Sequence, residues 1–380
     1  MDIPYGRQSV DETDIQAVVD VLRGDRITQG PAVEAFEAAL ARACDVPFAV
    51  AFSSGTAALH GAAFAAGLGS GDDLVTSALT FAASANCGVY LGARPVFADI
   101  DPKTWNVSGR TLAAACTPAT KAVVPVHFAG LPAPVAEIRR ALSRDIRIIE
   151  DAAHALGAIA DGEPVGCCRQ SDMTVFSFHP VKAITTGEGG MVTTRDPELK
   201  ERLLRFRNHG FVRDGSMRRR DEGAWYYEQH ELGFNYRLTD IHSALGRSQL
   251  DKLERFIERR NQVAERYREG FANCESVELP PPAPPGSRHA YHLFVVLHRG
   301  GAEGRRRLYE GLRSIGILGQ VHYLPPYLHP FYADTYGYHK GLCPQAERYY
   351  SRCLSLPCFP ALDAATQDRV ITAVRELAVG

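Results

Sequence analysis

The sequence has no long hydrophobic run and no surplus of charge of either sign. It contains no stretch of about 18 apolar residues, so we expect no membrane-spanning helix. The opening residues lack the basic and apolar segments of a signal peptide, and we therefore expect a cytoplasmic protein. The formal net charge of −2, from 42 basic and 44 acidic residues, gives no bulk attraction to nucleic acid or to an anionic membrane. Any phosphate group on a ligand must therefore be bound by local groups.

Metal-binding and dinucleotide-binding motifs are absent as well. The nine cysteines are scattered, and no pair has the CxxC spacing of a zinc site, so we expect no metal. We interpret them as free thiols in a reducing compartment. The G-x-G-x-x-G fingerprint of an NAD enzyme is missing, because Phe52-Ser-Ser-Gly-Thr-Ala57 contains a single glycine. We find no internal repeat and no low-complexity segment.

The sequence does contain an alternation of short apolar segments and amphipathic ones. Apolar spacing predicts helices over residues 11–23, 31–43, 57–66 and 84–91. Short apolar segments predict strands at residues 48–52, 73–77, 95–98, 122–126, 147–150, 173–178 and 191–194. This alternation predicts an α/β fold whose sheet is mostly parallel and covered on both faces. Ligands of such sheets bind beyond the carboxyl ends of the strands.

The pattern changes after about residue 246. A long charged helix is predicted at residues 250–268, and five prolines within residues 280–285 exclude a helix there. Further on, we predict strands at residues 292–297 and 318–323 and helices at residues 305–314 and 364–378. We therefore predict an N-terminal arm of residues 1–12, a large domain of residues 13–246 and a small α+β domain of residues 247–380.

Lys182 follows a predicted strand, in the segment Thr174-Val-Phe-Ser-Phe-His-Pro-Val-Lys-Ala-Ile-Thr-Thr-Gly-Glu-Gly-Gly190. It lies four residues past the end of that strand, near Ser177, His179 and Thr185. A lysine can form a Schiff base and shuttle protons where its surroundings lower its pKa. A loop lysine on its own is most often solvated, so this hypothesis depends on the motifs around it.

Asp151 ends another apolar strand, in Ile148-Ile-Glu-Asp-Ala-Ala-His154. A buried carboxylate needs a partner, and a protonated pyridine nitrogen is a suitable one. An aspartate in this position is also a common helix cap, and the motif alone leaves both interpretations open. His154 follows about one helical turn later and can reach the same ligand, although a lone histidine is more often a core residue.

Gly55 and Thr56 open a predicted helix in Ser53-Ser-Gly-Thr-Ala-Ala-Leu59. Free backbone N–H groups at the start of a helix bind phosphate. The motif is weak alone, because serine and threonine are ordinary helix caps. The three motifs occur in the order phosphate cradle, pyridinium partner and lysine, each at a strand end, and the set is far more specific than any member.

The sequence resembles the DegT/DnrJ/EryC1/StrS sugar aminotransferases, which have the aspartate aminotransferase fold (PLP-dependent transferase fold type I). The resemblance extends over nearly the whole chain. It is carried by Ile27–Pro31, Phe36-Glu37, Ser54–Leu59, Thr80–Asn86, Gly92–Phe97, Glu150–His154, Ser177–Lys182, Glu188–Gly190 and Gly233–Arg237.

The resemblance implies pyridoxal 5′-phosphate as the cofactor and gives roles to single residues. Lys182 would carry the cofactor, and Asp151 would pair with its ring nitrogen. His154 would contact the phenolic oxygen, and the ring of Phe81 would stack on the cofactor. The phosphate ligands would be Gly55, Thr56 and Ser177, together with Asn235 from the other subunit of an obligate homodimer. We interpret the basic run at residues 218–220 as a solvated loop, with a contact to a substrate phosphate as the alternative.

Within the family, three segments most resemble the transaminase of pseudaminic acid synthesis: Val175–Thr186, Gly319–Tyr327 and Leu354–Cys358. This implies transfer of an amino group from L-glutamate to C4 of a UDP-linked 4-keto-6-deoxy-N-acetylhexosamine. Another UDP- or dTDP-linked 4-keto- or 3-keto-sugar is the alternative. Aromatic rings and imidazoles suit a nucleotide sugar, which predicts substrate contacts from Tyr5, His322, Tyr323 and Tyr327, with packing of the small domain as the other interpretation.

Two other classes of function remain open. Some relatives carry histidine in place of the lysine and act as dehydratases, so the presence of Lys182 favours amine transfer. A regulatory protein that keeps the cofactor without turnover is the remaining alternative. Bleaching of the cofactor's absorbance by glutamate would exclude it.

Overall fold

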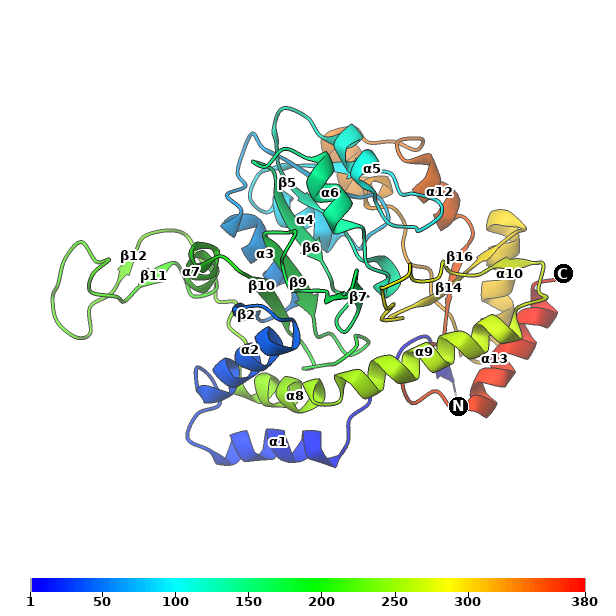
Figure 1. Cartoon of the computed structure of the whole chain (residues 1–380), viewed down its shortest axis with the longest axis horizontal. Helices are drawn as coiled ribbons and strands as arrows, with labels where there is room; N and C mark the ends of the chain where they lie inside the picture. The colour runs from blue at the N-terminus through cyan, green and yellow to red at the C-terminus, as the bar shows by residue number, and fades with distance from the viewer. Residues whose placement is uncertain (1, 380) are drawn as a thin grey trace.

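The computed structural model describes residues 2–379 and contains a central seven-stranded sheet (Figure 1). The strand order is β2 (Phe48–Phe52), β10 (Gly190–Thr194), β9 (Met173–Ser177), β6 (Arg147–Asp151), β5 (Thr120–Val124), β3 (Asp73–Ser77) and β4 (Arg94–Ala98). Strand β10 is antiparallel to both of its neighbours, and every other pair in this sheet is parallel. The predicted α/β fold with a mostly parallel sheet is confirmed.

Helices cover both faces of this sheet. Successive strand residues point to opposite sides, and here the side chains on both sides are apolar. In β2, Ala49 and Ala51 join one apolar cluster, whereas Val50 and Phe52 join another. The first cluster includes α2 (Pro31–Ala43) and α8 (Asp240–Leu250). The second includes α3 (Gly55–Ala65), α4 (Ala83–Val89) and α7 (Pro197–Phe206). A smaller cluster packs α5 (Gly109–Ala115) and α6 (Val135–Ala141) against β3, β5 and β6.

The chain enters this core through α1 (Glu12–Arg23), which packs against α8. The helix begins after Asp11, whose carboxylate accepts the N–H groups of Thr13 and Asp14 and so satisfies two donors that lack a partner inside the helix. At α2, Pro31 occupies the first turn, where a missing N–H costs nothing. These local signals explain why both helices begin within one residue of their predicted starts.

The long helix α9 (Leu253–Gly270) runs along the molecule from α8 toward the C-terminal elements (Figure 1). Its far half packs with α10 (Gly301–Ser314) and α13 (Ala364–Leu377) on an antiparallel sheet of β13 (Val277–Glu278), β14 (Phe294–His298) and β16 (Cys353–Leu356). The helices α11 (Pro330–Tyr336) and α12 (Pro344–Tyr350) pack on the other side, against residues near β4. The predicted domain boundary at residue 246 lies inside α8, and the division into three parts stays a prediction.

The predicted strand at residues 318–323 is wrong. Only β15 (Ile317–Leu318) forms there, and it pairs in parallel with β1 (Ile3–Pro4) at the start of the chain. Gln320 adds a single bridge to Ser355. Beyond Leu318 the segment follows the cavity instead of a neighbouring strand, and the adjacent residues His322 and Tyr323 both line that cavity.

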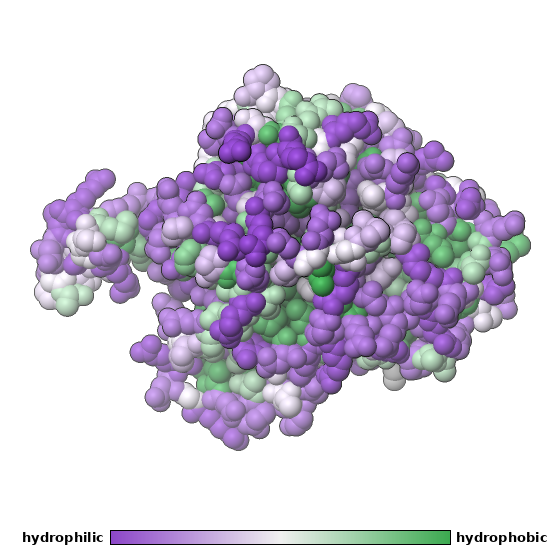
Figure 2. Space-filling view, viewed as in Figure 1, coloured by the Kyte–Doolittle hydropathy of each residue, from purple (hydrophilic) through white to green (hydrophobic). Residues whose placement is uncertain are grey.

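Two short hairpins complete the structure, one of β7 (Ile159–Ala160) with β8 (Glu163–Pro164) and one of β11 (Phe211–Val212) with β12 (Glu228–Gln229). The second projects far from the rest of the molecule (Figure 1). It carries apolar residues into the solvent, including Trp225, which is 77% exposed, and pale green patches mark the hairpin in Figure 2.

Within residues 2–379, no helix is both long and apolar enough to cross a membrane. The same residues bring together no group of three His, Cys, Asp or Glu side chains suited to a metal ion. All nine cysteines are free thiols, six of them buried.

Candidate active site

A cavity of about 410 Å³ lies at the carboxyl ends of β6 and β9, facing the first turn of α3. This is where a mostly parallel sheet binds its ligands. Of the residues predicted to form the site, the structure brings ten together around this cavity: Tyr5, Gly55, Thr56, Phe81, Asp151, His154, Ser177, Lys182, His322 and Tyr323.

The first turn of α3 forms one end of the cavity. Ser54 caps the helix by accepting the N–H of Ala57 at 3.1 Å. The N–H groups of Gly55 and Thr56 have no partner inside the helix, so they are available to an anion. A Cβ atom on Gly55 would lie 2.8 Å from the Cβ of Ser177, so only glycine lets α3 approach the end of β9 this closely. The cradle of backbone donors and the Ser177 hydroxyl suits a phosphate.

Asp151 is buried at the end of β6, with 6% of the residue exposed. One carboxylate oxygen accepts the hydroxyl of Ser84 at 2.6 Å, and the other accepts the N–H of Ala153 at 3.1 Å. Asp151 therefore caps a turn, whereas the alternative interpretation expected a helix that does not form here, and it faces the cavity. Its side chain makes no ion pair with a described residue, so a cationic ligand group such as a protonated pyridine nitrogen would supply the missing charge.

Lys182 lies in the loop after β9, and its backbone N–H binds the carbonyl of His179 at 2.9 Å. Burial lowers the pKa of its amine to about 8, against an opposing effect of the Asp151 carboxylate. Desolvation disfavours the charged ammonium, whereas the carboxylate favours it. A lysine in this state is a competent nucleophile and proton carrier near neutral pH.

His154, in the turn after β6, and Tyr323, in the segment after β15, form a pair that lines the cavity. The backbone N–H of Ala129 donates to Nδ1 of His154 at 3.3 Å, so the ring proton lies on Nε2, 3.2 Å from the Tyr323 hydroxyl. The Tyr323 hydroxyl accepts this proton and keeps its own hydrogen for the cavity. Burial and the Lys182 charge hold the pKa of His154 well below its usual range, so the imidazole is neutral.

The rest of the wall is aromatic. Phe81 remains 59% exposed, and its ring centre lies 5.9 Å from that of Tyr323. His322 packs against Tyr5 at 5.1 Å, and its Nδ1 lies 2.8 Å from the hydroxyl of Ser355. Burial and Lys182 lower the pKa of His322 to about 3. The cavity therefore presents neutral imidazoles and open ring faces.

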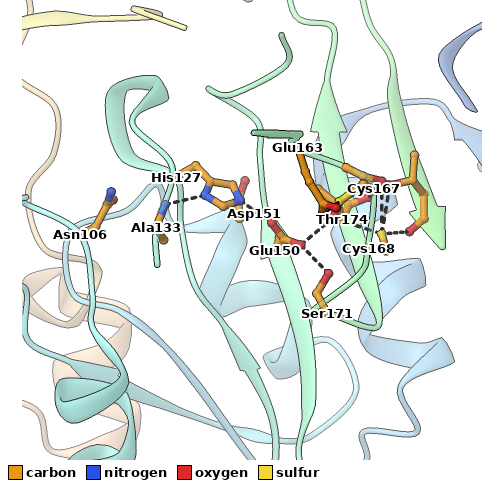
Figure 3. A network of polar contacts seen from close by, with 12 residues as sticks. Asn106, His127, Ala133, Glu150, Asp151, Glu163, Cys167, Cys168, Ser171 and Thr174 are labelled. Carbon is orange, nitrogen blue, oxygen red and sulfur yellow. Dashed lines mark hydrogen bonds and ion pairs between the residues drawn. The ribbon is translucent and has the colours of Figure 1, made fainter. Parts of the chain in front are cut away.

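A buried polar network holds β6 in place behind Asp151 (Figure 3). Ala133 donates its N–H to Nδ1 of His127 at 2.8 Å, so Nε2 carries the proton that binds Glu150 at 2.7 Å. Thr174 and Ser171 bind the other carboxylate oxygen of Glu150. Burial would raise the pKa of Glu150, but these donors outweigh it and lower the pKa. The network joins β6 to β9 and to the segment after β5.

Two predicted site residues lie outside the cavity. Tyr327 is fully buried, and its hydroxyl donates to Glu347 at 2.6 Å while its ring packs on Phe97. Its prediction as a substrate contact is corrected: Tyr327 packs the core. Asn235 forms a bridge with Asn208 beside the projecting hairpin and does not line this chain's cavity.

The sequence did not single out every residue of the wall. Ser84 fixes Asp151 and contacts Thr80 at 2.6 Å, and both belong to a segment that carried the family resemblance without a role for either residue. The ring of His292 packs against that of His154, tilted by 34°, with ring centres 4.3 Å apart, but in the sequence His292 is only the start of an apolar segment. Nothing local distinguishes such a histidine from a core residue.

The residues present fit pyridoxal phosphate. They offer a cradle too tight for a Cβ atom, a buried carboxylate without a cationic partner and a lysine of lowered pKa around one cavity. A sequence model of the DegT/DnrJ/EryC1/StrS aminotransferases matches residues 8–375. The chain belongs to this family. The protein is a pyridoxal-phosphate-dependent sugar aminotransferase of fold type I.

Three similar proteins illustrate this membership. The spore coat polysaccharide biosynthesis protein SpsC of Bacillus subtilis is 37% identical over 382 residues, which cover 100% of this chain and 97% of that protein. PseC of Helicobacter pylori, an aminotransferase involved in pseudoaminic acid biosynthesis, superposes with a TM-score of 0.92 at 30% identity, covering 100% of both chains. The PLP form of Spr1654 from Streptococcus pneumoniae, a proposed sugar aminotransferase, superposes with a TM-score of 0.92 at 28% identity, covering 100% of this chain and 99% of that one.

Proposed function

We propose that this aminotransferase moves an amino group from L-glutamate to C4 of a UDP-linked 4-keto-6-deoxy-N-acetylhexosamine, as in pseudaminic acid synthesis. The observation that carries the proposal is the composition of the cavity. Lys182 and Asp151 share it with a wall of Tyr5, His322 and Tyr323. Two of these aromatic residues lie in a segment that resembles the pseudaminic acid enzymes, and the fold matches PseC over the whole chain.

The cavity's residues divide the binding of the cofactor among them. When bound, pyridoxal phosphate supplies an electron sink and carries the amino group between the two substrates. The first turn of α3 and Ser177 would hold its phosphate, Asp151 would keep its ring nitrogen protonated, and Phe81 would cover the ring. His154 would contact its phenolic oxygen, and the Tyr323 hydroxyl beside it would face the sugar.

Lys182 is the proton carrier of the proposed reaction. Because its pKa is about 8, an appreciable fraction of the amine is unprotonated near neutral pH. Nζ then takes the proton from the α-carbon of glutamate in the first half-reaction. In the second, Nζ delivers a proton to C4 of the sugar. A positioned group of this kind contributes ~10²–10⁴-fold to a rate.

We propose a homodimer with shared sites, in which Asn235 reaches the cofactor phosphate of the partner subunit. In support, Asn235 lies outside its own cavity. Among the described residues no arginine lines that cavity, although glutamate and a nucleotide diphosphate are anions. The projecting hairpin carries arginines away from its own core, and the side chain of Arg220 is 74% exposed. The hairpin carries as many acidic residues as arginines, so single arginine side chains of a second copy, rather than a net positive charge, would contact these anions.

The substrate is tested by assaying the purified enzyme with glutamate and a panel of UDP- and dTDP-linked 4-keto- and 3-keto-sugars. We expect the largest kcat/KM for the UDP-linked 4-keto-6-deoxy-N-acetylhexosamine, with nuclear magnetic resonance placing the new amine on C4. A larger kcat/KM for another keto-sugar would refute the substrate. Failure of every keto-sugar to accept the amine, with no bleaching of bound cofactor by glutamate, would favour the regulatory alternative.

The shared site is tested by mixing inactive Lys182→Ala chains with inactive Asn235→Asp chains. In a verified heterodimer, one of the two sites would combine an intact lysine with an intact asparagine, so activity should return. A heterodimer without recovered activity would contradict sharing. Each variant mixed with itself is the matched control.

A different nucleotide keto-sugar is the second candidate. SpsC is 37% identical to this chain, whereas PseC is 30% identical, and the name of SpsC places it in polysaccharide rather than pseudaminic acid synthesis. The residues that would select one sugar substrate over the other lie on the cavity wall that contains Tyr5 and His322. The same substrate panel distinguishes them.

We also propose that the enzyme is cytoplasmic. All nine cysteines are free thiols, which persist in reducing compartments. Cell fractionation with an antibody to the protein tests this, and recovery outside the cytoplasmic fraction would contradict it.

A further inference from the structure

Arg260 is a buried charge outside the cavity. It lies on α9, with 1% of the residue exposed. Its guanidinium donates to backbone carbonyls only and forms no ion pair with any residue from 2 to 379. Burial lowers its pKa, which reflects the cost of keeping the cation dry. An apolar side chain would fill the same space without this cost. The reason for an arginine here must therefore lie in the backbone groups that the guanidinium binds.

The carbonyls belong to three separate segments. Nη1 binds the carbonyl of Cys358 at 2.7 Å and those of Tyr291 and His292 at 3.2 and 3.4 Å. Nη2 lies 3.5 Å from the carbonyl of Val181. The guanidinium is therefore the meeting point of the segment after β16, the segment before β14 and the loop after β9.

Two of these contacts lead directly into the cavity. Val181 and His292 both line it, and Val181 is the residue before Lys182. The Val181 carbonyl belongs to the same peptide unit as the Lys182 N–H, because a peptide group is planar. A donor that fixes this carbonyl therefore limits the rotation of the backbone that carries the lysine.

We propose that Arg260 is a positioning residue for Lys182. The guanidinium of Arg260 fixes the loop after β9 against the part of the cavity wall that contains His292. A guanidinium suits this task because its donors are held in one rigid plane and point to several acceptors at once. A lysine on α9 would keep the charge but present one compact donor group. The inference rests on the role proposed for Lys182 and adds that its placement is set from α9, 78 residues further along the chain.

The neighbouring Arg259 offers a matched control. It lies on the same helix and also donates to backbone carbonyls, those of Pro360 and Leu362, at 3.3 and 2.8 Å. It has no contact with Val181, and it does not line the cavity. Loss of Arg259 should therefore weaken the C-terminal elements without moving Lys182.

The experiment compares Arg260→Met, Arg260→Lys and Arg259→Met in the holoenzyme. It measures the melting temperature, the Kd for pyridoxal phosphate, the rate of cofactor capture on Lys182 by borohydride trapping, and the rate of cofactor bleaching by glutamate. We expect both Arg260 variants to capture the cofactor and to bleach about 10- to 100-fold more slowly, because a displacement of about 1 Å costs on this order. The Kd should change by less than about threefold, since the phosphate cradle is untouched.

The outcomes separate positioning from simple stability. Arg259→Met should lower the melting temperature and leave both rates at the wild-type value. If Arg260→Met and Arg260→Lys lose stability but keep both wild-type rates, Arg260 only packs the junction and the inference is overturned. If Arg260→Met does not fold, Arg260→Lys decides, because it keeps the buried charge. A wild-type enzyme labelled on a lysine other than Lys182 would refute the role proposed for Lys182, independently of the variants, whereas the substrate panel alone tests the proposed activity.

Discussion

The two walls of the cavity are built in different ways. The sheet wall, made of Gly55, Thr56, Asp151, Ser177 and Lys182, comes from strand ends and the start of one helix. The C-terminal wall, made of His292, His322 and Tyr323, comes from segments outside regular strands, held by partners distant in sequence. Tyr323 binds a histidine 169 residues away. We infer that the sheet wall performs the chemistry common to both substrates and that the C-terminal wall selects the sugar.

Loss of Lys182 should have the largest effect. Lys182→Ala removes both the covalent link to the cofactor and the proton carrier, so kcat should fall by more than ~10⁴-fold in both half-reactions. In the wild type, borohydride reduction and peptide mapping should place the pyridoxyl label on Lys182. Because its pKa is about 8, the rate of cofactor capture should rise with pH and reach half its maximum near pH 8. A half-maximum above pH 10 would show an ordinary, solvated lysine.

Asp151→Asn should come next. The neutral amide keeps the shape but cannot hold a proton on the ring nitrogen, so both half-reactions should slow by about 10²–10³-fold. Ser84→Ala is the matched control, because it removes one hydrogen bond to Asp151 and leaves the charge. Ser84→Ala should slow both half-reactions much less than Asp151→Asn does. Turnover of purified Asp151→Asn at the wild-type rate would contradict the assignment.

His322→Ala should separate the two walls. If His322 contacts the sugar nucleotide, its loss should raise the KM for that substrate by about tenfold, which corresponds to about 1.4 kcal/mol. The half-reaction with glutamate should be nearly unchanged, because glutamate does not occupy the nucleotide subsite. If both half-reactions decline together with the melting temperature, His322 only packs the wall through Ser355. An unchanged KM in a stable variant would remove His322 from the substrate site.

The smallest effects should distinguish two tyrosines four residues apart in the sequence. Tyr323→Phe removes the cavity hydroxyl beside His154, so it should slow the sugar half-reaction several-fold with little loss of stability. Tyr327→Phe removes a buried hydrogen bond to Glu347, so it should lower the free energy of unfolding by about 1–3 kcal/mol and leave kinetics unchanged. The two are measured by rapid-mixing kinetics and denaturant unfolding. The reverse pattern would exchange their roles.

The sheet wall was predictable because its signals are local. Three local signals are each visible within a few residues of sequence: an apolar strand ending at Asp151, another ending a few residues before Lys182, and a Gly-Thr pair that opens a helix. The parallel sheet then brings its carboxyl ends to one edge, so the three motifs meet without further information. Family resemblance added Phe81, His154 and Ser177, and the structure places all three around the same cavity.

The C-terminal wall was predictable only in part. A strand was predicted at residues 318–323, yet within that range only Leu318 pairs with β1. Tyr323 and Tyr327 look alike in the sequence, and only tertiary packing sends one to the cavity and the other to the core. Arg260 gave no signal at all, because one arginine in a helix rich in charged residues is indistinguishable from its solvated neighbours.

The pairing of β1 with β15 makes the start of the chain a proteolytic weak point of the site. Ile3 and Pro4 are held by one two-residue strand pair, and the next residue, Tyr5, lines the cavity against His322. Arg7 follows as an exposed trypsin target. A single cut there would leave the sheet wall whole, and Tyr5 would then be held only by this short pair, by the hydrogen bond from the Cys358 N–H to its carbonyl and by its packing on His322. Limited trypsin digestion should therefore abolish sugar binding before it unfolds the protein, and a bound nucleotide sugar that contacts Tyr5 should slow the cut.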